Sequence, residues 1–137
     1  MKDWFLWVVS TLFLWGFWGF LPKLATHYIS PMSALVFEVI GGTVVGICAL
    51  FFVGFRPETH PLGILFAVST GIVGVLGSFF YLMAVSKGKV SVIVVVTSLY
   101  PVITVVLAHF ILDEPISIRE GLGIILAFSA LVLCTVQ

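Results

Sequence analysis

The sequence predicts an all-α integral membrane protein with five transmembrane helices. The chain is 61% apolar and only 9% charged, with a mean hydropathy of +1.30, whereas a soluble domain carries about 25% charged residues. The charges gather in short groups, and apolar stretches of roughly 20 residues separate them, which is the length that crosses a hydrocarbon core. Each span must be helical, because an open strand leaves its backbone polar groups unsatisfied in lipid.

Each predicted span has its own start or stop signal. Ser30 precedes Pro31 as a helix N-cap and a first-turn proline, and Pro61 opens the third span in the same way. Ser117 and Glu120 have the spacing of a capping box before the last span. The chain is predicted to be a single transmembrane domain, residues 1–137, with spans at about 4–25, 31–55, 61–86, 91–112 and 118–136.

Composition and motifs also exclude several classes of function. The net charge is zero, so the chain lacks the basic patch that nucleic-acid binding needs. The sequence has no HExxH, GxSxG or phosphate-loop motif, and no cysteine or histidine pattern with metal-ligand spacing. We therefore expect neither an enzyme, a cofactor nor a metal.

Glu38 is the only acid deep inside a predicted span, since Glu120 lies in the first turn of the last one, and Lys23 lies at the end of the span before Glu38. An ionisable group at membrane depth is costly and is a candidate for function. A carboxyl group in a low-dielectric environment can exchange protons near neutral pH, which suits coupling. The alternative is a structural ion pair between Glu38 and Lys23, or a Lys23 side chain that extends to the headgroups.

The first span carries all four tryptophans on one face. Trp4 and Trp7 have the positions of interfacial anchors. Trp15 and Trp18 lie deeper, where they could stack on an organic or cationic substrate, although packing or lipid contact would also explain them.

Pro101 interrupts the fourth span, since it lacks the N–H that would bond to the carbonyl of Thr97. Thr97, Tyr100 and Thr104 share one face there, and a broken helix beside hydroxyl groups can form a midplane binding site. The alternative is a kink whose free carbonyl is satisfied by Ser98 or Thr104.

Two spans carry stripes of small residues that predict close helix packing. The stripe on the third span includes Gly71, Gly74 and Gly77, and that on the fifth includes Gly123 and Ala127. We interpret both as packing seams rather than substrate contacts.

In order and spacing, several short motifs resemble one EamA-type domain of the drug/metabolite transporter superfamily. The motifs are Trp15-Gly16 with Lys23 eight residues later, Pro31, Ala84, Leu99-Tyr100-Pro101 and Asp113-Glu114-Pro115-Ile116-Ser117, in which Glu114 matches the family's usual Glu. The resemblance covers essentially the whole chain and implies half of a ten-helix transporter of small organic solutes. Glu38 departs from the pattern, because many members have Arg at that position.

The basic residues give no orientation preference. With five spans, Lys2, Arg56 and Arg119 lie on one side of the membrane and Lys23, Lys87 and Lys89 on the other. Orientation follows the excess of Lys and Arg, so such a half could insert both ways and pair as an inverted repeat.

We therefore predict a proton-coupled transporter of small organic molecules in the plasma or inner membrane, with alternating access in a homodimer of opposed protomers. The alternatives are a non-transporting accessory subunit of a larger membrane complex and a flippase for lipid-linked substrates.

Overall fold

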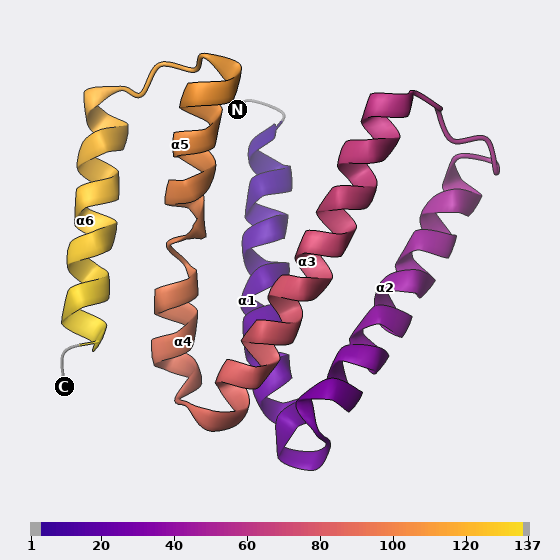
Figure 1. Cartoon of the computed structure of the whole chain (residues 1–137), viewed down its shortest axis with the longest axis horizontal. Helices are drawn as coiled ribbons and strands as arrows, with labels where there is room; N and C mark the ends of the chain where they lie inside the picture. The colour runs from indigo at the N-terminus through magenta and orange to yellow at the C-terminus, as the bar shows by residue number, and fades with distance from the viewer. Residues whose placement is uncertain (1–3, 136–137) are drawn as a thin grey trace. The chain divides into compact units, whose positions relative to one another are not determined.

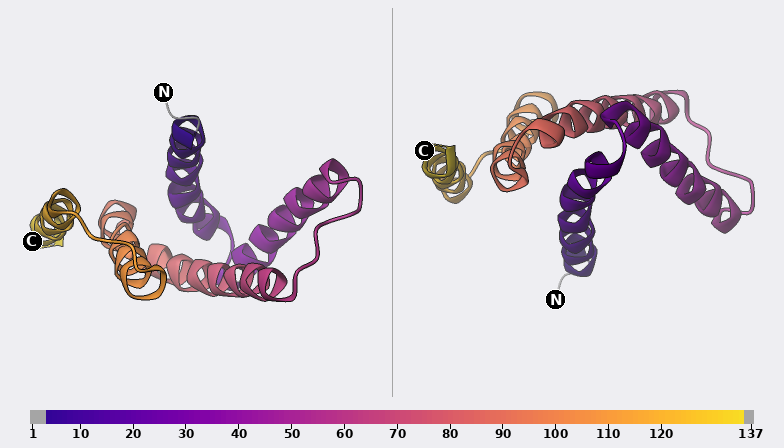
Figure 2. Two further views of the ribbon diagram at one scale, coloured as in Figure 1. Left: turned by 90° about the horizontal axis from the view of Figure 1, so that it is seen from above. Right: turned by 90° about the horizontal axis from the view of Figure 1, so that it is seen from below.

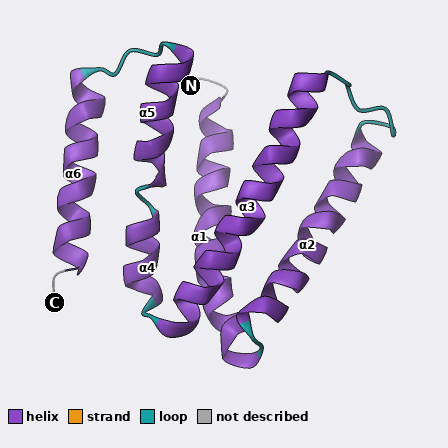
Figure 3. Ribbon diagram, viewed as in Figure 1, coloured by secondary structure: helices purple, strands orange, loops and turns teal. Residues whose placement is uncertain are grey.

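The computed structural model describes residues 4–135, with side chains over residues 4–133, and it is helical throughout apart from short connections (Figure 3). Internal contacts divide the chain into two compact units, Met1–Lys87 and Gly88–Gln137. In the part of the chain that the structure describes, each unit contains three helices. The helices are α1 Trp4–Tyr28, α2 Pro31–Phe52, α3 Pro61–Lys87, α4 Val90–Thr97, α5 Tyr100–Leu112 and α6 Ile118–Thr135 (Figure 1).

Within the described residues, four segments are long and apolar enough to cross a membrane: Trp4–Tyr28, Pro31–Phe52, Pro61–Lys87 and Val90–Leu112. The last of these combines α4 and α5. The fifth predicted span overlaps α6, which is not among these four segments and whose described part ends at Thr135. The all-helical architecture and the four apolar spans are those of a multi-pass membrane protein.

The ends of α2 follow local backbone chemistry. The Ser30 hydroxyl accepts a hydrogen bond from the N–H of Ser33, and Pro31 occupies the first turn. At the other end, Gly54 has a φ of +60°, its N–H bonds to the Phe51 carbonyl, and the Phe55 N–H bonds to the Leu50 carbonyl. This pair of bonds is a Schellman motif, so the helix ends at Phe52 rather than at the expected residue 55.

The core of the first unit lies at one end of its three helices. α1, α2 and α3 approach one another near the α1–α2 connection and the end of α3, and they spread apart in the other direction (Figures 1 and 2). The buried residues all belong to the converging end: Gly19, Pro22, Ala34, Ser78, Tyr81, Leu82 and Val85. Small residues and the proline of α1 let the three backbones meet there.

In the second unit, α4 packs against α6, and the span of α4 and α5 is broken at Ser98 and Leu99. Pro101 lies in the first turn of α5, as expected of a residue that cannot continue the hydrogen bonds of a preceding helix. The Ser117 N–H and hydroxyl both donate to the Glu120 carboxylate at the start of α6, so the predicted capping box is present.

Candidate functional site

A cluster of polar side chains lies where α1, α2 and α3 converge, centred on Glu38 of α2. The Glu38 side chain is half-buried. Its Oε1 atom accepts a hydrogen bond of 3.0 Å from the Trp18 indole N–H and one of 2.8 Å from the Ser78 hydroxyl. The three helices thus meet at a single carboxylate oxygen.

The helical repeat explains why these residues meet. Ser78, Tyr81, Leu82 and Val85 recur at the spacing of one helix face, and all four are buried. On α2, the buried Ala34 lies one turn before Glu38, and its small side chain allows α3 to approach closely. Glu38 is thereby placed against Ser78, the first residue of the buried face of α3.

Trp18 and Tyr81 form a stacked aromatic pair beside the carboxylate. Their ring centroids are 5.3 Å apart and their planes differ by 26°. The buried Tyr81 hydroxyl donates a hydrogen bond to the Gly19 carbonyl of α1. Trp18 therefore has two fixed neighbours, the Tyr81 ring and the Glu38 oxygen, which hold its indole in one orientation.

Lys23 extends from α1 to the end of α3. Its ammonium donates a hydrogen bond of 2.7 Å to the Val85 carbonyl, and the Lys23 side chain is half-buried. The two hydrogen-bond donors to Glu38 are neutral, and a Lys23–Glu38 ion pair is not among the contacts of the described residues. Lys23 therefore contacts the backbone at the end of α3. The structure shows this contact in place of the hypothesised ion pair between Lys23 and Glu38.

Trp15 and Trp18 differ in their local surroundings. Trp15 is 56% exposed and lies one turn before Trp18 on α1, whereas Trp18 is part of the Glu38 cluster. The site role predicted for Trp15 stays a prediction.

Thr97, Tyr100 and Thr104 of the second unit have exposed side chains, while Leu99 and Val102 on another face of the span are half-buried. The two threonine hydroxyls bond to carbonyls in the preceding turn of the same span. Thr97 donates to the Ile93 and Val94 carbonyls, and Thr104 donates to the Tyr100 carbonyl at 3.4 Å.

The break at Pro101 is not repaired by the two hydroxyls that were considered for it. The Ser98 hydroxyl donates to the Val95 carbonyl at 2.7 Å, and the Thr104 hydroxyl donates to that of Tyr100. Neither hydroxyl has a described hydrogen bond to the Thr97 carbonyl. A cavity role for this face stays a prediction.

The small-residue stripes are open within their own units. A Cβ atom built on Gly71, Gly74, Gly77 or Gly123 would meet nothing within 4 Å, and Ala127 is exposed. If these stripes are packing seams, their partners lie outside the unit that carries them.

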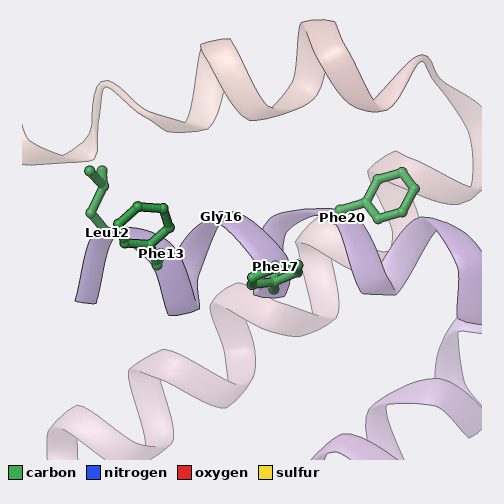
Figure 4. Close-up of a pocket in the computed structure, with 5 residues that line it drawn as sticks. All are labelled: Leu12, Phe13, Gly16, Phe17 and Phe20. Atoms are coloured by element: carbon green, nitrogen blue, oxygen red, sulfur yellow. The ribbon is translucent and has the colours of Figure 1, made fainter. Parts of the chain in front are cut away.

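An apolar hollow lies on α1, lined by Leu12, Phe13, Gly16, Phe17 and Phe20 (Figure 4). At 100° per residue it occupies a different face from Trp15 and Trp18. Its lining offers no hydrogen-bonding side chain to orient a ligand, so the Glu38 cluster is the stronger candidate site.

Reasoning from the sequence missed Ser78 and Tyr81 as partners of the site. A serine and a tyrosine three residues apart on one face of an apolar span were the available signal, because polar groups at membrane depth usually bond across helices.

Four apolar membrane-length helices, with an acid half-buried between three of them, define a multi-pass membrane protein with a polar site inside its spans. Residues 2–136 match the EamA-like transporter family, and the chain belongs to that family. It is accordingly a membrane transporter of the drug/metabolite type. The uncharacterized protein MJ1333.1 of Methanocaldococcus jannaschii is 28% identical over 125 residues, which cover 90% of this chain and 89% of that protein. No solved structure matches the chain.

Proposed function

We propose that this chain transports small organic molecules across the cell membrane by alternating access, that Glu38 couples transport to protons, and that two opposed copies form the working unit. The observation that carries the proposal is the Glu38 carboxylate, which accepts hydrogen bonds from Trp18 and Ser78 where three helices meet.

The cost of the acid supports a functional role. A carboxyl group within a span costs several kcal/mol unless it faces protein or water. A purely structural contact between α1, α2 and α3 could use neutral groups at lower cost. Two fixed donors on one oxygen instead preorganise the group, while the second oxygen can take up a proton or a ligand.

The proposed dimer follows from charge and size. Three basic residues on each side of the predicted membrane give no orientation preference. The similar protein from Methanocaldococcus jannaschii is of nearly the same length, since the aligned residues cover 90% of this chain and 89% of that protein. Two such halves in opposite orientations would form an inverted repeat, in which substrate sites lie near the bilayer midplane.

Uptake by reconstituted liposomes tests this proposal. Purified protein would be assayed against a panel of amines, amino acids and aromatic metabolites, with and without a pH gradient. We expect the pH gradient to accelerate the uptake of at least one substrate by the wild-type protein. The gradient should have no effect on uptake by the Glu38→Gln variant. The matched control is Glu58→Gln, which removes an exposed acid in the loop before α3 and should retain the acceleration.

Proton-driven uptake by Glu38→Gln at the wild-type rate would remove Glu38 from the coupling mechanism. Purified protein that moves no solute, and that is stable only together with a second polypeptide, would contradict transport by this chain alone and would favour an accessory subunit.

A further inference from the structure

The Glu38 carboxylate has one occupied oxygen and one that remains available. Both of its hydrogen bonds end on Oε1, and within residues 4–133 no described hydrogen bond reaches Oε2. Because a buried acceptor without a partner does not occur among the described side chains, Oε2 is open to the surroundings of the helix. A ligand can therefore approach this oxygen without displacing Trp18 or Ser78.

The described hydrogen bonds to the Glu38 carboxylate come from neutral groups, the Trp18 indole and the Ser78 hydroxyl. On the facing helices, the Lys23 ammonium is directed to the Val85 carbonyl, and the Tyr81 hydroxyl to the Gly19 carbonyl. The remaining titratable side chains on the described parts of α1, α2 and α3 are His27, Tyr28, Cys48 and Lys87, and none of them has a described hydrogen bond to Glu38. When Glu38 is ionised, the site has one negative charge held by neutral donors.

An aromatic surface adjoins this charge. Trp18 donates its N–H to Glu38 and stacks one ring face on Tyr81. The indole is still 42% exposed, so part of it is available to a ligand. Aromatic rings attract cations through their quadrupole, most strongly tryptophan. A carboxylate oxygen and an indole at one place are complementary to an ammonium group with an apolar substituent.

From this arrangement, and resting on the transport function proposed above, the geometry points to a monovalent organic cation as the substrate class, bound at Glu38 Oε2 and against Trp18. The cation and a proton compete for the same carboxylate. A neutral or anionic solute gains nothing from the negative charge. A metal ion such as Ca²⁺ would need about six to eight oxygen ligands, whereas a single carboxylate oxygen is available here.

Binding of benzyltrimethylammonium to the purified wild-type protein tests the inference. This cation has a fixed charge and one aromatic ring, and benzyl alcohol and phenylacetate are its neutral and anionic counterparts. We expect saturable binding of the cation alone. Its affinity should fall on acidification, because protonation of the Glu38 carboxylate removes the charge that binds the cation. In weakly buffered solution, at a pH where acidification has already weakened binding, cation binding should release protons.

Variants assign the binding to the two residues. Glu38→Gln should abolish cation binding and proton release. Trp18→Phe should weaken binding about 2- to 30-fold, as expected for loss of an indole–cation contact. Trp7→Phe is the matched control, because Trp7 is 76% exposed near the start of the same helix, and its affinity should be unchanged.

Equal affinity for benzyl alcohol, binding without proton release, or unchanged binding in a monodisperse Glu38→Gln variant would each overturn the cation assignment. The affinity for benzyl alcohol and the proton release are measured on the wild-type protein, so these two tests do not depend on the folding of a variant. Glu38-dependent uptake of a neutral or anionic solute in liposomes, without cation binding, would leave the proposed transport intact and reject only this substrate class.

Discussion

The Lys23 ammonium donates a 2.7 Å hydrogen bond to the carbonyl oxygen of Val85, 62 positions away in the chain. Val85 is fully buried in the last turn of α3. The helical partner of its carbonyl would be the N–H of residue 89, which lies beyond the end of the helix at Lys87. Lys23 therefore supplies a donor and a positive charge where the helix dipole is negative, and it joins α1 to α3.

Replacing Lys23 by Met should destabilise the protein by about 1 to 3 kcal/mol, because it leaves the buried Val85 carbonyl without this donor. Lys23→Arg, which keeps a charged donor, should cost less. Thermal or denaturant unfolding in detergent measures the difference. Lys89→Met, in an exposed position with no side-chain cap bond, is the control. Equal stability of Lys23→Met and Lys89→Met would show that the contact contributes nothing.

Tyr81→Phe should cost about 0.5 to 1.5 kcal/mol, the net value of a typical hydrogen bond, because it removes the donor to the Gly19 carbonyl and keeps the ring stacked on Trp18. Tyr28→Phe is matched to it, since Tyr28 is 87% exposed, and should have no effect. Unfolding of the two variants under the same conditions is the measurement. If Tyr81→Phe leaves the stability unchanged, stacking on the ring alone positions the Trp18 indole.

The balance of basic residues predicts that both membrane orientations coexist. C-terminal reporters that are active only inside or only outside the cell should both give signal. Adding two lysines at the C-terminus should drive the population to one orientation, because charges in short flanking segments set topology. A single orientation of the unmodified chain would argue against an opposed homodimer, unless a second half-size chain supplies the inverse copy.

Pro101→Ala should restore the N–H that bonds to the Thr97 carbonyl and make α4 and α5 continuous. We expect higher thermal stability together with slower transport, if the break provides the bend needed to switch access. Val105→Ala, a substitution at a half-buried position of the same span, is the control. It should lower thermal stability, and so should not combine higher stability with slower transport. Faster or unchanged transport in a stabilised Pro101→Ala variant would show that the break is only a packing feature.

Cysteine substitution tests the face beside this proline. After replacement of the native cysteines, positions 97 and 104 should react with a water-soluble thiol reagent, whereas the half-buried positions 102 and 105 should not. Such a contrast is expected if the Thr97 face lines a wet cavity. Equal labelling of both faces would place the site elsewhere.

The sequence by itself determined that the chain is an all-helical, multi-pass membrane protein and approximately where its helices lie. A membrane span is specified locally, since its length, apolarity, capping residues and prolines all lie within one segment. The predicted break in the fourth span and the N-caps at Ser30 and Ser117 follow from such local chemistry. The end of α2 was expected at about residue 55, whereas the helix ends at Phe52. The apolar residues Val53 and Phe55 could continue the helix, but Gly54 adopts a positive φ and forms the turn that ends it.

The partners of the ionisable residues were decided only by tertiary structure. Glu38 and Lys23 were identified from sequence because charge inside a span is rare, and an ion pair between them was considered. The convergence of α1, α2 and α3 instead directs Glu38 to Trp18 and Ser78, and Lys23 to a backbone carbonyl. Which hydrogen-bonding groups meet depends on the crossing and rotation of whole helices. Those are set by the summed packing of many side chains, so no single residue or spacing encodes them.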